Sequence, residues 1–386
     1  MNGGGERSLA DLLALHTLDP EGRTSVVRLR GLLTAARFFR AATGHGLRRR
    51  PGQQFLHEGE DEHGHHRPRH EQTGQRTEPT MYPADHRCGK YTSGVKIGLS
   101  SAGRIYMSDL SERRAKFRQL HESGCFVIPN PWDAGSAIYL RAAGFPALAT
   151  TSAGAAFSMG KSDGAVSRSA MLEHIEAIVK ATELPVNADF EVGYAAGPEG
   201  VADSVRRCVE TGVAGLSLED ATRNPAKPLF PLDEAVERIR AARRAIDASG
   251  TGVLLTARAE CYLVGIDEPL RESIRRLQAY AEAGADVLYA PGPRTREDFL
   301  AIVQAVHPKP VNALALAGNT LTVAGYADLG VRRISVGSAL ARCAWGGFLR
   351  AVHMMAEEGS FAGLNDGTPF DALNRFFRTS GNSDIL

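Results

Sequence analysis

The sequence predicts an α/β protein: a (β/α)8 TIM barrel with C-terminal helices, preceded by a largely disordered N-terminal segment. Three observations predict this fold. Short apolar runs alternate with longer helical patterns from residue 107 onward. Eight such units fit into about 230 residues, close to the roughly 250 residues typical of this barrel. Glycines at Gly144, Gly212, Gly284 and Gly330 each separate a helical pattern from an apolar run, which suits a left-handed helix cap.

The first 106 residues differ in composition from the rest. Eight of the twelve histidines lie there, five of them between His57 and His70. Residues 44–104 lack the apolar periodicity that a buried core requires. We therefore predict that residues 1–106 are a low-complexity segment, disordered or not part of the native product. Met107 begins an ordinary helical pattern, so residues 107–386 are predicted to be the catalytic barrel with a C-terminal helical extension.

Each predicted strand is a short apolar run that leads into polar or turn-forming residues. The eight strands are Phe126–Ile128, Ala147–Thr150, Val186–Ala188, Gly215–Leu218, Val253–Ala257, Val287–Tyr289, Val311–Ala313 and Arg333–Val336. The helical patterns between them cover Ala134–Ala143, Arg168–Ala181, Gly200–Thr211, Leu232–Ala248, Pro269–Ala283 and Arg296–Ala305. An open doubly wound sheet is disfavoured, because no GxGxxG motif follows the first strand and every strand end carries polar groups.

Charge and cysteine content exclude several classes of protein. The 45 Lys and Arg residues balance 44 Asp and Glu residues, whereas nucleic acids and anionic membranes require a strong basic bias. No run approaches the roughly 20 apolar residues of a membrane helix. The five cysteines form no CxxC pair and fit free thiols in a reducing compartment. We therefore expect a cytoplasmic protein that binds neither nucleic acid nor a membrane.

Acidic residues gather at the predicted strand ends, where the active site of such a barrel lies. Asp189 and Glu191 follow the third strand, Glu219 and Asp220 follow the fourth, and Asp163 lies in the loop after the second. Several carboxylates at one mouth repel one another unless a cation neutralises them. Because no histidine or cysteine lies among them, the pattern indicates Mg²⁺ or Mn²⁺ rather than Zn²⁺. For any single one of these carboxylates, the alternative to metal binding is a structural role as a helix cap or a salt-bridge partner.

Two other strand ends predict substrate contacts. Arg258 ends the fifth strand, where its guanidinium could hold a substrate carboxylate through two hydrogen bonds. Pairing of Arg258 with Glu260 or Glu219 is the alternative. The second strand leads into TTSAGAA, whose hydroxyls and small residues would let backbone amides approach a carboxylate closely.

Several segments, taken in chain order, resemble the isocitrate lyase and phosphoenolpyruvate mutase superfamily. VNADFEVGYAAGPEG is similar to its D-x-E/D-x-G-Y-G segment, and LSLEDA to its I-E-D element. LLTARAE resembles its A-R-T-D/E strand, and GVRRISVGSALAR its final strand and the following helix. FVIPNPWDAGSA and ATTSAGAAFSMGKSDG are similar to the opening strands of the mutase-like branch. The resemblance spans about Arg113 to Phe377.

This resemblance implies a barrel enzyme that binds Mg²⁺ (or Mn²⁺) and acts on small 2-oxo or 2-hydroxy acids through an enolate or an equivalent oxyanion. Its metal site would comprise Asp189, Glu191 and Glu219, several of them acting through waters. Asp163, Glu219 and Arg258 would be the catalytic residues. The residues implied to bind the substrate are Ser152, Ala153, Gly154, Arg258 and Asn312.

Two departures from the superfamily pattern restrict the expected reaction. The region after the fourth strand reads EDATRNPAKPLFPLDEA and lacks the K-K/R-C-G-H loop of isocitrate-type lyases, whose cysteine protonates the enolate. The sixth strand leads into YAPGP, with Pro291 where mutases place a histidine and lyases a glutamate. The proton donor is therefore left open among Tyr194, Glu260, Asn312 and a bound water.

The leading expectation is a Mg²⁺-dependent lyase that cleaves a C–C bond in a small 2-oxo or 2-hydroxy dicarboxylic acid and releases pyruvate or a relative. The alternatives are a phosphonopyruvate hydrolase or mutase that acts on a P–C bond, an oxaloacetate decarboxylase, and a metabolite-binding barrel without turnover. The final helices, GGFLRAVHMMAEEG and FDALNRFF, carry more apolar residues than one barrel face requires. We therefore expect a homo-oligomer, a dimer or a tetramer, with core packing inside one chain as the alternative.

Overall fold

The computed structural model describes residues 15–18, 24–27, 101–318 and 320–379, with side chains from residue 109 onward. In the N-terminal unit, β1 (Leu15–Leu18) pairs antiparallel with β2 (Thr24–Val27). The rest of the predicted low-complexity segment lies mostly outside the described residues. Helix α2 (Ser101–Leu120) runs through Met107 without a break. The division of the chain at Met107 therefore stays a prediction.

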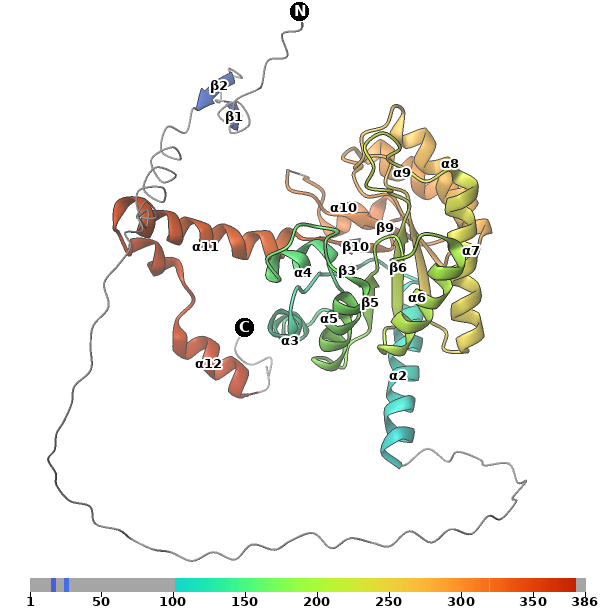
Figure 1. Ribbon diagram of the computed structural model, residues 1–386, viewed down its shortest axis with the longest axis horizontal. Helices are drawn as coiled ribbons and strands as arrows, with labels where there is room; N and C mark the ends of the chain where they lie inside the picture. Colours follow the sequence, from blue (N-terminus) through green and yellow to red (C-terminus); the bar gives the residue numbers. More distant parts are fainter. Residues whose placement is uncertain (1–14, 19–23, 28–100, 319, 380–386) are drawn as a thin grey trace, which may run out of the picture. The chain divides into compact units, whose positions relative to one another are not determined.

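Eight parallel strands form the barrel (Figure 1). They are β3 (Phe126–Ile128), β4 (Leu148–Ala149), β5 (Val186–Asp189), β6 (Gly215–Glu219), β7 (Leu254–Arg258), β8 (Val287–Tyr289), β9 (Val311–Leu314) and β10 (Arg333–Ser335). Their order in the sheet is β3-β10-β9-β8-β7-β6-β5-β4. At the seam, the Ala149 amide donates to the Pro129 carbonyl at 3.1 Å, and the Asn130 side chain donates to the Thr150 carbonyl at 2.9 Å. These bonds bring the two end strands together, and the predicted barrel is confirmed.

The helices follow the strands in alternation. They are α3 (Ala134–Ala142), α4 (Ser152–Ser158), α5 (Arg168–Lys180), α6 (Pro198–Glu210), α7 (Leu232–Ser249), α8 (Pro269–Glu282), α9 (Arg296–Val306), α10 (Val323–Asp328), α11 (Ala339–Glu358), the 3-10 turn η1 (Ala362–Asp366) and α12 (Phe370–Arg378). All six predicted helices are present, with ends within two residues of the prediction. The short helix α4 forms within TTSAGAA and the residues after it, where no helix was predicted. The four glycines predicted to cap helices have φ between 83° and 100°, so they adopt the left-handed conformation.

Side chains alternate between the two faces of each strand. In β6, Leu216 and Leu218 belong to the apolar core that also contains side chains of α6 and α7, whereas Ser217 faces the barrel interior. The Phe117 ring of α2 packs directly against Gly215. A Cβ atom on that glycine would lie only 2.7 Å from the ring, so glycine leaves the space that the ring needs. Helix α2 thus packs against the N-terminal ends of the strands, and the opposite ends are left for the site.

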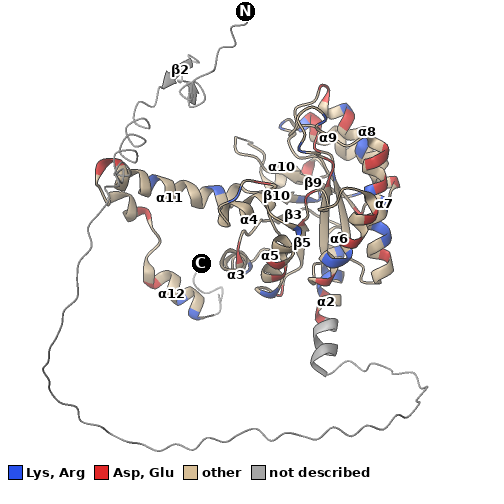
Figure 2. Cartoon of the chain, viewed as in Figure 1, with Lys and Arg blue, Asp and Glu red and all other residues tan. Residues whose placement is uncertain are grey.

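Charged side chains of both signs lie on the outer helices α7, α8 and α9 (Figure 2). This mixture agrees with the near-zero net charge of the whole chain. Helix α11 carries few charges over its middle part in the same view. Of the helices in the described part of the chain, none is long and apolar enough to cross a membrane.

Candidate active site

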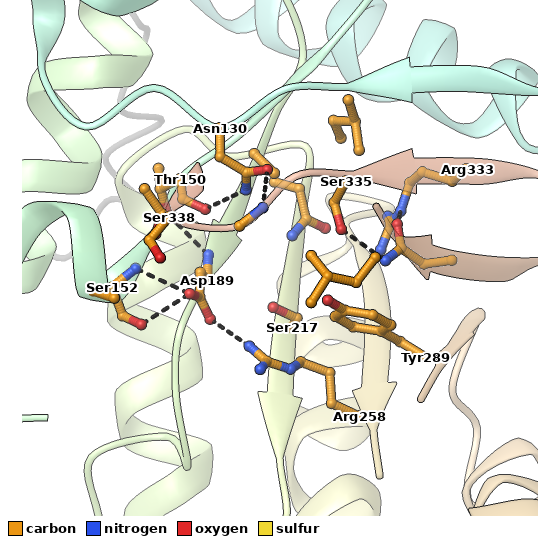
Figure 3. Close-up of a pocket in the computed structure, with 18 of the residues that line it drawn as sticks. Asn130, Thr150, Ser152, Asp189, Ser217, Arg258, Tyr289, Arg333, Ser335 and Ser338 are labelled. Carbon is orange, nitrogen blue, oxygen red and sulfur yellow. Dashed lines mark hydrogen bonds and ion pairs between the residues drawn. The ribbon is translucent and has the colours of Figure 1, made fainter. Parts of the chain in front are cut away.

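A cavity of about 180 Å³ lies at the C-terminal ends of the strands and extends into the barrel (Figure 3). Each of the eight strands contributes at least one side chain or backbone segment to its lining. Its volume is below the roughly 300 Å³ at which drug-sized ligand sites begin. The cavity itself therefore suits a small ligand.

At the mouth of the cavity, the structure brings together side chains from three predicted strand ends. One oxygen of Asp189 accepts hydrogen bonds from the backbone amide and from the hydroxyl of Ser152, both at 2.9 Å. Its other oxygen accepts from Arg258 at 2.9 Å. The Ser152 hydroxyl also lies 3.5 Å from a carboxylate oxygen of Asp163. Four of the predicted site residues, Ser152, Asp163, Asp189 and Arg258, therefore meet at one place.

Arg258 is surrounded by carboxylates. Its guanidinium lies 2.9 Å from Asp189, 3.2 Å from Glu219 and 2.7 Å from Glu260. Burial acts to lower the pKa of Arg258, but the carboxylates outweigh it and raise the pKa well above its usual value. The pairing with Glu260 and Glu219 considered from the sequence is therefore present. Direct binding of a substrate carboxylate by Arg258 stays a prediction.

Glu191 lies beside the mouth and does not line the cavity. The Tyr194 hydroxyl donates to one of its oxygens, and Arg223 donates to the other at 2.8 Å. All three residues have positive φ, at 46°, 52° and 62°, a backbone region that costs free energy for non-glycine residues. Arg223 also lies 3.9 Å from Glu219, so it links Glu191 to the mouth. Burial and the Glu191 charge raise the pKa of the Tyr194 phenol, and its hydroxyl is already bonded to Glu191.

Negative charge is in excess at the mouth. The carboxylates are Asp163, Asp189, Glu191, Glu219 and Glu260, and the guanidiniums are those of Arg223 and Arg258. Burial, opposed by Arg258 and reinforced by neighbouring carboxylates, raises the pKa of Glu219, and a cation at the mouth would favour its ionised form. An oxygen-only donor set with unneutralised charge fits a hard divalent cation. Within the described ranges, no three acidic, histidine or cysteine side chains form a ready-made metal cluster. The predicted metal residues Asp189, Glu191 and Glu219 are therefore not brought together as one such cluster, and the metal site stays a prediction.

The predicted carboxylate-binding segment forms the first turn of α4. Ser152 and Ala153 line the cavity. The Gly154 amide donates to the Thr151 hydroxyl at 3.2 Å, so it is used by the helix cap. A Cβ atom on Gly154 would lie 2.6 Å from the Thr151 methyl carbon and 3.0 Å from the Trp132 Cβ. Glycine is therefore required here by close packing.

The inner end of the cavity is lined by the predicted residue Asn312 and by Arg333 and Ser335, which were not predicted to belong to the site. Asn312, predicted to bind substrate, lines the cavity, but its amide accepts from Arg333 at 2.8 Å and donates to the Ser335 hydroxyl at 3.0 Å. Arg333 and Ser335 alternate with the outward-facing Ile334 in β10. The alternation of polar and apolar residues along this strand is visible in the sequence, but it does not show which of the two sets faces the barrel interior.

Tyr289 ends β8 and was also missed. Its ring centre lies 5.2 Å from the guanidinium carbon of Arg258, and Figure 3 shows the ring between Arg258 and Ser335. Burial raises the pKa of the Tyr289 phenol to about 12. Tyr289 therefore keeps a neutral hydroxyl inside the cavity at physiological pH.

Comparison with known proteins identifies the family. The family model described as phosphoenolpyruvate phosphomutase matches residues 117–356, which include the whole barrel. The chain belongs to this phosphoenolpyruvate phosphomutase family. The resemblance of its segments to the isocitrate lyase and phosphoenolpyruvate mutase superfamily is thereby confirmed.

Known members of the phosphomutase family and of its superfamily align with most of the barrel region of this chain. The 2-methylisocitrate lyase of Halalkalibacterium halodurans is 26% identical over 262 residues, 65% of this chain and 85% of that protein. A solved Burkholderia cenocepacia J2315 protein, provisionally classed as a lyase/mutase, is 47% identical with a TM-score of 0.68, covering 71% of this chain and 99% of the other. Oxaloacetate acetylhydrolase, solved with its product oxalate, is 28% identical with a TM-score of 0.62, covering 71% and 96%. These similarities support a lyase or mutase function.

Proposed function

We propose that this protein is a Mg²⁺-dependent lyase that cleaves a carbon–carbon bond in a small 2-oxo or 2-hydroxy dicarboxylic acid and releases pyruvate or a close relative. The observation that carries the proposal is the network at the mouth, where Ser152 and Arg258 hold Asp189 beside Asp163 over a small polar cavity. The superfamily relatives named 2-methylisocitrate lyase and 2,3-dimethylmalate lyase support the choice of a C–C bond.

The side chains at the mouth would position the cation and the reacting end of the substrate. Asp189 and Asp163 offer oxygen donors, and Ser152 and Arg258 fix the orientation of Asp189 through three hydrogen bonds. When bound, Mg²⁺ would supply Lewis-acid stabilisation of the negative charge that develops on the 2-oxo oxygen. Tyr289 lines the cavity with its ring beside Arg258, so we propose that its hydroxyl donates the proton to the enolate carbon and then regains one from water.

The test measures pyruvate release by the full chain, with and without Mg²⁺, from oxaloacetate, phosphonopyruvate, 2-methylisocitrate and alkyl-substituted malates. We expect Mg²⁺-dependent turnover of one C–C substrate, with kcat at least about a hundredfold lower in Asp189→Ala. The matched control is Asp203→Ala, because Asp203 pairs with Arg206, Arg207 and Arg168 on the surface of the described barrel. Turnover that needs no metal and survives Asp189→Ala would reject the proposal.

The same panel separates the alternative functions. Phosphate and pyruvate released from phosphonopyruvate would indicate a hydrolase, and conversion of phosphonopyruvate to phosphoenolpyruvate would indicate a mutase. Carbon dioxide released from oxaloacetate would indicate a decarboxylase. Mg²⁺-dependent oxalate binding without turnover of any substrate would indicate a metabolite-binding barrel. Each outcome uses the same carboxylates at the mouth, so Asp189→Ala remains the informative variant in every case.

The C-terminal helices support a homo-oligomer as a further part of the proposal. Large apolar side chains remain exposed on α11, η1 and α12, namely Phe348, Leu349, Phe361, Leu364, Phe370 and Leu373. Phe370 alone keeps 78% of its surface exposed, which is costly in water. We propose that a second copy of the chain covers this surface. Sedimentation of the full chain is expected to show a dimer or a tetramer, and a monomer would contradict the proposal.

The described cysteines support a reducing environment. Cys125, Cys208, Cys261 and Cys343 are free thiols. Burial raises the pKa of Cys261 to about 11, so it remains a protonated thiol. We propose on this basis that the protein works in the cytoplasm.

A further inference from the structure

A buried arginine without a carboxylate partner lies at the inner end of the cavity. Arg333, at the start of β10, is 3% exposed and lines the cavity. Its guanidinium donates to Asn312 at 2.8 Å and to the Thr256 hydroxyl at 3.1 Å, and it lies 3.3 Å from a ring nitrogen of His121. Over residues 109–318 and 320–379, no carboxylate forms an ion pair with Arg333. Its positive charge is therefore uncompensated by the protein.

His121 and Tyr289 do not supply the missing negative charge. The Nδ1 atom of His121 lies 2.7 Å from the Phe117 carbonyl, so this nitrogen carries the proton and Nε2 accepts from Arg333. The imidazole is thus neutral. The Tyr289 phenol is also neutral, because burial raises its pKa to about 12.

A buried charge without a counter-charge is costly, so proteins rarely retain one in a packed interior. Arg333 has five N–H donors, and its three contacts within the described residues use three of them. Two of its donors therefore have no acceptor among residues 109–318 and 320–379. Because Arg333 lines the cavity, a bound ligand can supply that acceptor.

We propose that Arg333 forms an anion-binding subsite at the inner end of the cavity. The subsite would receive the distal carboxylate of a ligand whose other end lies at the carboxylate-rich mouth. The inference rests on the proposed function and deepens it, because it assigns a place to each of the two acidic groups of a dicarboxylic substrate. A carboxylate forms paired, charge-assisted hydrogen bonds with a guanidinium, which would use the two remaining donors.

The test compares two ligands that differ only in the distal group: malate and its 4-amide, malamate. Calorimetric titration of the full chain in Mg²⁺ is expected to show at least about tenfold tighter binding of malate. Arg333→Met, which keeps the length of the side chain and removes the charge, is expected to bring the two affinities within about twofold. Arg333→Lys is expected to retain part of the preference, because it retains the charge.

Equal affinities for malate and malamate in the unmodified chain would overturn the subsite, and so would a preference that survives in folded Arg333→Met. The ligand comparison requires no variant, so it decides the question even if Arg333→Met does not fold. Oxalate lacks a distal group and reports on the mouth alone. Failure of Mg²⁺-dependent oxalate binding would count against the proposed function, whereas the ratio of malate to malamate affinity decides the subsite separately.

Discussion

Arg258 at the mouth of the cavity and Arg333 at its inner end are both largely shielded from solvent, and the surroundings of the two differ. Arg258 contacts three carboxylates at the mouth, whereas Arg333 contacts an amide, a hydroxyl and a neutral imidazole. The mouth therefore has an excess of negative charge and the inner end an excess of positive charge. A cation bound at the mouth and an anionic group of the substrate bound at the inner end would complement these two charges. This complementarity is evident only when the surroundings of both arginines are compared.

The largest expected effect is the difference in stability between the Arg258→Met and Arg333→Met variants. Arg258→Met would leave the Asp189, Glu219 and Glu260 carboxylates without their shared counter-charge, so we expect the free energy of unfolding to fall by about 3–5 kcal/mol. Arg333→Met would leave only neutral acceptors unpaired and would also remove an uncompensated buried charge, so we expect a loss of no more than about 1 kcal/mol. Urea denaturation of both variants measures the difference. An equal or larger loss in Arg333→Met would contradict this account of the two ends.

The next expected effect concerns Tyr289, which lies between the two arginines. Tyr289→Phe keeps the aromatic ring beside Arg258 and removes only the hydroxyl. If that hydroxyl protonates the enolate, kcat falls about a hundredfold, a difference of about 2.7 kcal/mol, while KM changes little. The measurement is steady-state turnover of the substrate found in the panel. An unchanged kcat would assign the proton transfer to another group, and thermal unfolding serves as the control for folding.

The smallest expected effect concerns pH at the inner end of the cavity. Burial and the nearby Arg333 charge lower the pKa of His121 to about 3, against 6.5 in the unfolded chain. The folded protein excludes a proton that the unfolded chain binds, so stability is fully present above pH 6.5 and falls as the pH decreases toward 3. The loss reaches about 2 kcal/mol at pH 5. Urea denaturation across this range should show the slope, and His121→Gln should reduce it; an unchanged slope in the variant would assign the effect elsewhere.

Much of the fold could be predicted from local sequence patterns. The helix Arg168–Lys180 begins at the predicted residue and ends one residue early, because apolar spacing and a capping serine mark it locally. Asp189 and Arg258 could also be selected, since each directly ends an apolar run and the C-terminal ends of barrel strands converge. Helix α4 was missed, because its small residues and glycine are as typical of a turn.

The sequence by itself determined the order of strands and helices, the glycine caps, and the residues at the strand ends. Only the tertiary structure decided which strand residues face the interior and which charges meet. The physical reason is that barrel strands are buried on both faces, so their apolar pattern does not mark the inward face. For this reason Arg333 and Tyr289 appeared in the sequence as ordinary strand residues. Whether a guanidinium meets three carboxylates or none depends on contacts between strands distant in the chain, and those contacts give the two ends of the cavity opposite charge.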